Sequence, residues 1–425
     1  MSGRAWVRLD NASNIFLAAR SDTDSKVFRI SAEVDHEVDP LLLQAALDST
    51  YDRYPLYRAV LRRGVFWYYL QDSDLRPRVS LEQQPTCAAI YQADRRTLLF
   101  RVVYYRRRIV LETFHALSDG TGALWFLSDL VNAYVSLRYP GDYVPPTDPP
   151  HELVGDSFGK YFRGRSPEGR KRQAFGSRAY RVRGTRTPDN RTRAVELTMP
   201  VADVLRLARA EGVTLTMYLT ALFFEAIRRD AGDLGKHRTI AASVPVNLRQ
   251  FFPSTSARNF FTTVRVEHTY GDPGSDDLGA VCRDLEAQFR PKTAPEALEK
   301  HLRQLIRLER MPLLRVVPRP LKDFLLGLIN RSSNRGLTVA LSNLGNVMLP
   351  EPAESRVGRM LFHVSAARPQ FCAISHAGLI TVTFTSPFSE TGHVREFARM
   401  LTAHGVDVTV AAARVTEAEL AEAAR

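Results

Sequence analysis

The residues best able to perform chemistry are His115 and Asp119, followed closely by Gly120 and Gly122. An imidazole titrates near neutral pH, so His115 could act as a general base on an alcohol or an amine. Asp119 could hold the turn by accepting backbone N–H bonds or by pairing with a cation. The two glycines let the chain turn tightly without a side-chain penalty. The same pattern also occurs as a structural turn beside a partly buried histidine.

The segments on either side of this turn would bring His115 to a cleft. Residues 108–114 alternate in the manner of a strand, and residues 123–139 carry apolar side chains at helical spacing. A side chain between the end of a strand and the start of a helix can leave the core and face a binding site. The sequence therefore predicts a base at a strand-to-helix junction.

Segment 115–120 (HALSDG) resembles the His-x-x-x-Asp-Gly motif of the chloramphenicol acetyltransferase-like superfamily. That group includes condensation domains of nonribosomal peptide synthetases, alcohol acetyltransferases and polyketide-associated acyltransferases. Other segments resemble the same superfamily in the same order: 53–58 (RYPLYR), 245–249 (PVNLR), 259–261 (NFF) and 342–345 (SNLG). Condensation domains usually carry a second histidine where this chain has Phe114. The resemblance is therefore closest to stand-alone alcohol acetyltransferases and polyketide-associated acyltransferases of secondary metabolism.

The resemblance implies an α/β fold of two lobes, each a mixed β-sheet flanked by helices, arranged as a V around a central tunnel. We expect an N-terminal lobe over residues 1–155 that carries the histidine motif. A basic linker would follow over 156–192, and a second acyltransferase-like lobe over 193–425. Cations are dense between 160 and 186. They could bind coenzyme A phosphates, an acidic carrier protein or anionic lipid, or they could form a solvated linker.

The resemblance also assigns roles around His115. Asp119 and Gly120 would be structural, with Asp119 paired to an arginine that holds the histidine loop. Arg58 is the residue whose local motif matches that partner. Alternatively, Asp119 only caps the helix that follows.

Further candidates lie in the second half of the chain. The segment 342–345 resembles the superfamily's crossover near the tunnel, which implies that Asn343 or Ser342 would stabilise the oxyanion, with the backbone N–H of Gly120 as a further candidate. Asn343 could equally support a turn before Gly345. Asn247 and Arg249 would shape the acceptor side, or would form a local network at a strand end.

The implied activity is transfer of an acyl group from a coenzyme A thioester to the hydroxyl of a small-molecule or lipid alcohol, with His115 as general base. Coenzyme A would be a co-substrate, and we expect no bound cofactor and no metal. An acyl carrier protein is the alternative donor. Two further alternatives are an N-acyltransferase with a carrier-bound donor and a non-catalytic condensation-like module that binds a carrier protein or lipid.

Composition and charge bear on the partners and the cellular location that we expect for this protein. The chain has 425 residues and a formal net charge of +12, which favours acidic partners. Aromatic residues do not cluster among the cations, so we expect no nucleic-acid binding. Three widely spaced cysteines fit reduced thiols in the cytoplasm. The start of the chain does not resemble a signal peptide, and no apolar run of about 18 residues is present. We expect a monomer.

Other patterns predict the remaining elements. Strands are expected at 27–34, 58–62, 65–70, 97–105, 194–199, 239–246, 260–268, 338–342, 370–375, 380–385 and 406–410, and helices after Asp39 and Thr214 and over 201–211 and 391–401. Residues 294–331 read as a basic helical region. Its 311–329 segment could lie on a membrane, guard an acyl tunnel, or be an ordinary helix that faces the core.

Overall fold

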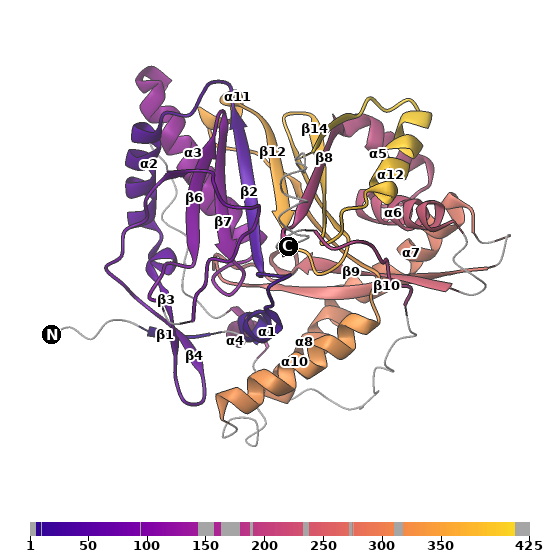
Figure 1. Cartoon of the computed structure of the whole chain (residues 1–425), viewed down its shortest axis with the longest axis horizontal. Coiled ribbons are helices and arrows are strands. Elements are labelled where there is room, and N and C mark those ends of the chain that lie inside the picture. Colours follow the sequence, from indigo (N-terminus) through magenta and orange to yellow (C-terminus); the bar gives the residue numbers. More distant parts are fainter. Residues whose placement is uncertain are drawn as a thin grey trace.

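The computed structural model describes residues 6–9, 11–93, 95–142, 157–162, 179–187, 190–232, 238–271, 274, 276–309 and 318–412. Two large β-sheets stand side by side, each with helices packed on it (Figure 1). One sheet comes mainly from the first half of the chain and the other from the second half. Each sheet has its own cluster of buried apolar side chains. The predicted α/β class with two lobes is confirmed.

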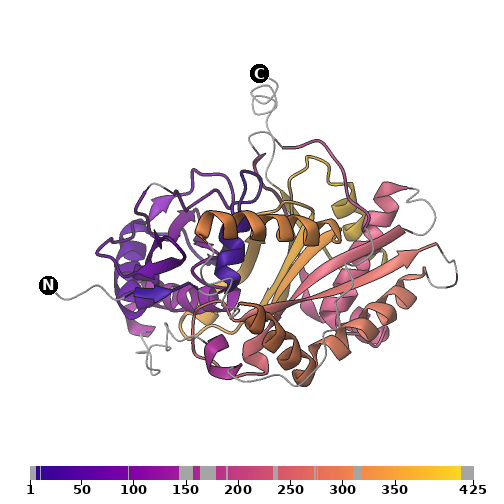
Figure 2. The same cartoon turned by 90° about the horizontal axis from the view of Figure 1, so that it is seen from below.

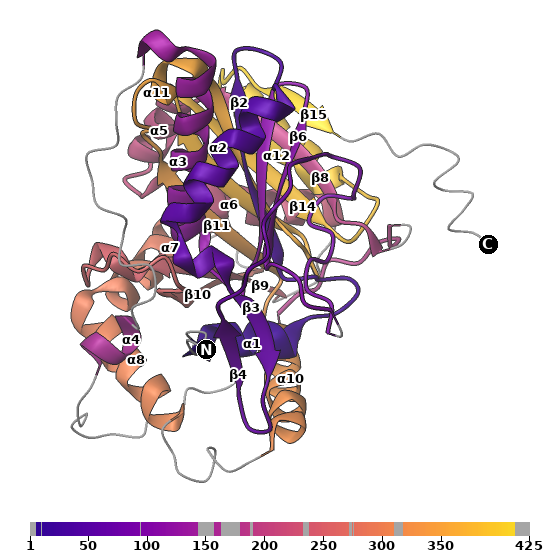
Figure 3. The same cartoon turned by 90° about the vertical axis from the view of Figure 1, so that its left-hand side faces the viewer.

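The first sheet places the histidine motif at the end of one of its strands. Its order is β12 (Val357–Val364), β2 (Val27–Val34), β7 (Arg108–Phe114), β6 (Phe100–Tyr105) and β5 (Ser80–Leu81). Neighbouring strands are antiparallel except for β5 and β6. Two helices, α2 (Pro40–Arg53) and α3 (Gly120–Arg138), pack side by side against this sheet (Figure 3). The predicted hairpin that ends at His115 is therefore present as β6 and β7.

A small three-stranded sheet joins β1 (Trp6–Arg8), β4 (Tyr68–Gln71) and β3 (Val60–Arg63) in that order. The predicted hairpin over 58–70 is confirmed as β3 and β4, which pair in antiparallel register. Both strands are shorter than expected because residues 64–67 form the turn, where the Gly64 N–H donates to the Trp67 carbonyl oxygen at 2.8 Å.

The second sheet is larger. Its order is β10 (Phe261–Tyr270), β9 (Arg238–Asn247), β11 (Val339–Asn346), β13 (Gln370–His376), β14 (Leu379–Ser386), β8 (Arg193–Pro200) and β15 (Thr409–Ala412). Strand β11 runs parallel to both of its neighbours, and the other pairs are antiparallel. Its helices are α5 (Val201–Ala210), α6 (Leu215–Ala231), α7 (Leu278–Thr293) and α12 (Gly392–Ala403).

Strand β12 departs from the predicted division of the chain. We expected all residues after 193 to belong to the second lobe, yet β12 pairs with β2 at the edge of the first sheet. It lies next in sequence after β11, so the chain crosses from the second sheet to the first and returns to the second at β13. No pattern in the sequence predicted this strand. The second half of the chain therefore contributes one strand to the sheet of the first lobe, in addition to the contacts between the surfaces of the two lobes.

Charged side chains also connect the lobes at this crossover. Arg108 on β7 donates two hydrogen bonds of 2.8 Å to the carboxylate of Glu196 on β8. Arg359 on β12 donates to Glu33 on β2 at 2.6 Å and to Thr198 on β8 at 3.0 Å. The edge of one sheet is thereby tied to a strand of the other.

Both predicted helix caps are present. The Asp39 carboxylate accepts hydrogen bonds from the backbone N–H groups of Leu41 and Leu42, and Pro40 occupies the first turn. The Thr214 hydroxyl accepts from the backbone N–H of Met217. These caps satisfy N–H groups that have no partner within the helix.

The basic helical region predicted over 294–331 is divided. It contains α8 (Pro295–Glu309) and α10 (Arg319–Arg335), while residues 310–317, including Met311, Leu313 and Leu314, lie outside the described residues. Within the predicted linker only residues 157–162, 179–187 and 190–192 are described, and most of its cations lie outside them. The linker boundaries remain a prediction.

The other described helical elements are short or peripheral. They are α1 (Asn11–Ala19), α4 (Ser157–Tyr161), α11 (Ala353–Arg356) and the 3-10 turns η1 (Pro55–Arg58), η2 (Pro140–Asp142) and η4 (Leu248–Gln250). Over the described ranges no single helix is long and apolar enough to cross a membrane. The pair α5 and α6 reaches that length only together, with a bend of 84° between them.

Candidate active site

His115 lies where the sequence predicted it, between the last residue of β7 and the first turn of α3. Its backbone N–H donates to the Lys26 carbonyl oxygen at 2.8 Å, which continues the pairing of β7 with β2. The Asp119 carboxylate caps α3 by accepting from the Gly122 N–H at 2.9 Å. The loop between strand and helix is thus fixed at both ends.

Three aromatic rings surround the half-buried His115 imidazole. Phe16 of α1 stacks on it with ring centroids 4.0 Å apart, Phe28 of β2 meets it at 5.0 Å, and Phe261 of β10 lies at 5.5 Å. Burial disfavours the charged imidazolium and lowers the pKa of His115 to about 4, although the negative charge of Asp119 opposes this. His115 is therefore neutral at physiological pH, as a general base must be.

Asn259 determines which imidazole nitrogen carries the proton. Its side-chain nitrogen donates to the Ser13 hydroxyl at 2.9 Å and to the His115 carbonyl oxygen at 2.8 Å. A carbonyl oxygen can only accept, so this end of the amide must be the NH₂ group. The amide oxygen then faces His115 Nδ1 at 3.2 Å and requires a proton there. The lone pair is left on Nε2.

The sequence did not identify Asn259 as a site residue. It was part of the 259–261 segment that resembles the superfamily, but nothing local indicates that its amide lies against His115. Only the packing of β10 beside the end of β7 brings these residues together. The likeness of segment 259–261 to the superfamily was the one signal in the sequence that could have pointed to Asn259.

The arginine paired with Asp119 is Arg249, not Arg58. Arg249 Nη1 lies 2.7 Å from Asp119 Oδ2, which also accepts from the Phe260 N–H at 2.8 Å. Arg58 instead donates to the Asp52 carbonyl oxygen at 2.9 Å. The prediction failed because Arg58 belongs to η1 in the first lobe, whereas η4 of the second lobe reaches the histidine loop.

Further hydrogen bonds of Arg249 and Asn247 surround the Asp119–Arg249 ion pair. The Arg249 guanidinium also donates to the carbonyl oxygens of Ser256, at 2.7 Å, and Arg258, at 2.6 Å. The Asn247 amide oxygen accepts from the Arg249 N–H at 3.0 Å, and its nitrogen donates to the Thr121 hydroxyl at 3.1 Å. These contacts correspond to the alternative expectation of a network at a strand end, and a role of Asn247 and Arg249 at the acceptor side stays a prediction.

Close packing explains both glycines of the motif. A Cβ at Gly122 would come within 2.2 Å of the Ala257 carbonyl oxygen and 2.4 Å of the Ser118 hydroxyl. A Cβ at Gly120 would lie 2.8 Å from a methyl group of Leu344. The first contact joins the loop to the second lobe, and the second places the 342–345 segment against the loop.

The oxyanion candidates Ser342 and Asn343 lie in that neighbouring segment, where Asn343 bonds to Thr216 and Gly345. The Asn343 side-chain nitrogen donates to the Thr216 hydroxyl at 3.0 Å, and its oxygen accepts from the Gly345 N–H at 2.8 Å. Gly345 has a positive φ of 76° inside β11, where the register to β13 shifts between Asn343 and Asn346, so Asn343 supports an irregularity within the strand and not the predicted turn. Ser342 is half-buried one residue before it. The structure thus groups His115, Asp119, Gly120, Asn247 and Arg249 and places Arg58 elsewhere.

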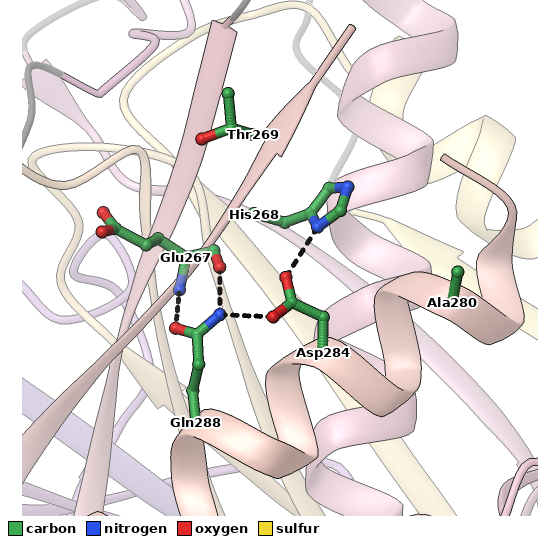
Figure 4. A pocket seen from close by; sticks show the side chains of 6 residues that line it. All are labelled: Glu267, His268, Thr269, Ala280, Asp284 and Gln288. Atoms are coloured by element: carbon green, nitrogen blue, oxygen red, sulfur yellow. Dashed lines mark hydrogen bonds and ion pairs between the residues drawn. The ribbon is translucent and has the colours of Figure 1, made fainter. Parts of the chain in front are cut away.

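A separate pocket lies between β10 and α7 (Figure 4). His268 Nδ1 lies 2.8 Å from Asp284, and Gln288 bonds to Asp284 and to the Glu267 backbone. The Asp284 carboxylate is thus shared by His268 and Gln288, while the Glu267 carboxylate and the Thr269 hydroxyl bond to Arg265 and Thr239 outside the pocket. His268 lies roughly 23 Å along β10 from Phe261, at the usual rise of a strand, so the pocket is remote from His115. Among the described residues, no three His, Cys, Asp or Glu side chains could hold a metal ion.

Comparisons with known proteins identify the fold. No family model and no curated protein matches the sequence. Polyketide synthase associated protein 5 from Mycobacterium tuberculosis is similar in structure, with a TM-score of 0.63, 15% identity, and coverage of 93% of this chain and 96% of that one. TRI3 trichothecene 15-O-acetyltransferase from Fusarium sporotrichioides gives a TM-score of 0.62 at 12% identity and covers 94% of both chains.

A third similar structure is TRI101 from F. sporotrichioides, crystallised with coenzyme A and T-2. Its TM-score is 0.63 at 10% identity, with coverage of 95% of this chain and 99% of that one. Nonribosomal peptide synthetase domains are also similar, among them an epimerization domain of tyrocidine synthetase B. The chain therefore has the two-lobed fold of the condensation-domain-like acyltransferases.

Proposed function

We propose that this protein is an acyltransferase that moves an acyl group from a coenzyme A thioester to an alcohol hydroxyl, with His115 as the general base. The observation that carries this proposal is the contact between Asn259 Oδ1 and His115 Nδ1, because it leaves the Nε2 lone pair available. A lowered pKa keeps that nitrogen unprotonated near neutral pH. The fold shared with acetyltransferases supports the same reaction class.

The proposed reaction needs no covalent enzyme intermediate. Nε2 of His115 takes the hydroxyl proton while the alcohol oxygen attacks the thioester carbonyl carbon. The tetrahedral intermediate then collapses, the carbon–sulfur bond breaks, and the Nε2 proton passes to the departing thiolate. The products are an ester and a free thiol. General-base assistance of this kind contributes about 10² to 10⁴ in rate.

Oxyanion stabilisation would come from the 342–345 segment or from the backbone N–H of Gly120. Leu344 packs on Gly120, so this segment borders the histidine loop. Asn343 would have to exchange its hydrogen bond to Thr216 for one to the substrate. Ser342 is the other side-chain candidate. One donor of this kind typically contributes about 3 to 4 kcal/mol.

Asp119 and Arg249 would act as positioning residues. Their ion pair is buried, with side chains 6% and 7% exposed. It holds the loop that carries His115 against the second lobe and contributes no proton to the reaction. Substitution of Asp119 or Arg249 would therefore lower both the stability of the fold and the rate of acyl transfer.

Coenzyme A is the proposed donor, and a carrier-bound thioester is the alternative. The formal charge of +12 suits a phosphate-rich donor, and the TRI101 structure contains coenzyme A. The test measures thiol release from acetyl- and longer acyl-coenzyme A with a panel of alcohols and amines. Wild type should release thiol only with an acceptor, His115→Ala should not, and His404→Ala, an exposed control, should match wild type.

The second candidate is a non-catalytic module that binds a carrier protein or lipid. Absence of turnover with both coenzyme A and carrier-bound donors would favour it. Turnover with amines alone, from a carrier-bound donor, would instead indicate an N-acyltransferase.

A further inference from the structure

Helix α10 exposes an apolar face. Leu321, Phe324, Leu325 and Leu328 are 50%, 62%, 41% and 46% exposed. Their spacing of three and four residues places them on one side of the helix. Four large apolar side chains in contact with water on one helical face form a recognition surface rather than isolated exposures.

The turn between β3 and β4 lies beside α10 and exposes two further apolar side chains. Val65 and Phe66 at its tip are 73% and 43% exposed. Lys322 of α10 donates to the Phe66 carbonyl oxygen at 3.2 Å, and its ammonium lies 3.5 Å from the centre of the Trp67 ring. The hairpin and the helix project from the same end of the molecule (Figures 1 and 3).

The half-buried side of α10 fixes this arrangement. The Tyr68 hydroxyl donates to Asp323 at 2.8 Å, so the acidic residue of the helix faces the hairpin. We call the exposed residues Val65, Phe66, Leu321, Phe324, Leu325 and Leu328 the α10 surface.

Basic residues accompany the α10 surface. Among the α10 residues whose side chains are described, Lys322 and Arg335 are basic and Asp323 is the one acid. Strand β3 adds the exposed Arg62 and Arg63, and segment 60–71 contains no acidic residue. This excess agrees with the overall charge of +12. The partner of this surface should therefore be both apolar and anionic.

We propose that the α10 surface docks on an anionic phospholipid bilayer. An amphipathic helix with apolar side chains on one face and cations beside them is suited to the boundary between headgroups and acyl chains. A second copy of this chain fits less well, because two positively charged surfaces would repel each other. The α10 surface would place α1, whose Phe16 stacks on His115, next to the bilayer, since α10 packs on α1 (Figure 2). The proposal does not depend on the reaction proposed above.

Flotation of the full chain with vesicles tests this proposal. Wild type should float with phosphatidylcholine vesicles that contain a quarter phosphatidylglycerol, and much less with phosphatidylcholine alone. Binding to the anionic vesicles should fall at high salt because the charges are screened. The double variant Phe324→Ser with Leu325→Ser should bind at least about ten-fold more weakly.

The matched control is Leu41→Ser, because Leu41 is 80% exposed on α2, away from the α10 surface. It should bind vesicles like wild type. Thermal unfolding should show that both variants remain folded, as expected for exposed positions. A second measurement uses Phe324→Trp, whose added fluorescence should shift to shorter wavelength when anionic vesicles are present.

Absence of vesicle binding by wild type would overturn the proposal, as would equal binding by the double variant. A concentration-dependent dimer in light scattering that the double variant abolishes would also overturn it and assign the surface to a second copy. Thiol release in solution is measured separately, so failure of docking and failure of the proposed reaction can be distinguished.

Discussion

Arg249 Nη1 and Asp119 Oδ2 lie 2.7 Å apart in a buried ion pair that joins the two lobes. Asp119 belongs to the histidine loop of the first lobe, and Arg249 follows β9 of the second. The Arg249 guanidinium also donates hydrogen bonds to the backbone carbonyl oxygens of Ser256 and Arg258, so the same side chain holds both the histidine loop and the 256–258 segment. The candidate base is therefore positioned by a contact between lobes rather than by its own lobe alone.

Loss of either partner should destabilise the protein. Asp119→Ala or Arg249→Ala leaves a buried charge without a partner, at a cost of about 3 to 5 kcal/mol in the free energy of unfolding. Urea denaturation measures this change. Arg76→Ala is the control, because Arg76 pairs with Asp52 at the surface with side chains 56% and 57% exposed, and its loss should lower the free energy of unfolding far less. Equal effects of the buried and exposed pairs would contradict the interpretation.

Gly122→Ala should loosen the histidine loop. The added methyl group would meet the Ala257 carbonyl oxygen at 2.2 Å, so backbone must move. We expect a loss of about 1 to 3 kcal/mol in the free energy of unfolding, together with reduced thiol release. Gly358→Ala is the matched control, since a Cβ there meets nothing within 4 Å. An unchanged Gly122→Ala protein would show that the loop is not packed as described.

The pH profile should report the lowered pKa of His115. Only neutral imidazole can take a proton, and burial moves its pKa down to about 4. The acid limb of kcat/KM should therefore lie near pH 4, with no decline between pH 8 and 6. Profiles of wild type and His404→Ala should coincide. A limb centred near 6.5, the ordinary value for histidine, would argue against a buried base.

Asn259→Ala should affect turnover more than substrate binding. Without the amide oxygen, Nδ1 no longer has to carry the proton, and the ring loses its fixed orientation. We expect kcat to fall about ten- to a hundred-fold with little change in KM for the acyl donor. The control is Asn334→Ala, because Asn334 is also half-buried but lies near the C-terminal end of α10. A change in KM alone would assign Asn259 to substrate binding.

Glu196→Gln should weaken the joint between the lobes in a pH-dependent manner. Burial by itself would raise the pKa of Glu196, but contacts with His363 and Arg108 outweigh it and lower the pKa to about 2. Because the folded pKa lies below the unfolded value of 4.5, the stabilisation is complete above pH 4.5 and is lost as pH falls toward 2.

The expected difference between wild type and Glu196→Gln is about 3 kcal/mol at pH 7, and it should shrink near pH 3. Urea titrations at both pH values measure it. Glu299→Gln, a control in the α8 pair with Arg303, should change stability by at most about 0.5 kcal/mol at either pH. A difference for Glu196→Gln that is independent of pH would contradict the role of its charge.

The sequence by itself determined the local frame of the site. Alternation over 108–114 and helical spacing after 123 were enough to place His115 between a strand and a helix. Asp39 and Thr214 were recognisable as helix caps because a cap depends on neighbours within a few residues. Segments in the order of a known superfamily then indicated the two-lobed fold, which the structure and the similar solved structures confirm.

Tertiary structure decided which distant residues meet. Arg249 rather than Arg58 pairs with Asp119, Asn259 fixes the proton on His115, and β12 crosses to the first sheet. Each of these contacts joins residues more than a hundred positions apart. Hydrophobic periodicity records which face of an element is buried, but not which other element covers it. The partners of His115 and Asp119 therefore follow from how the two lobes pack, and only the folded chain shows them.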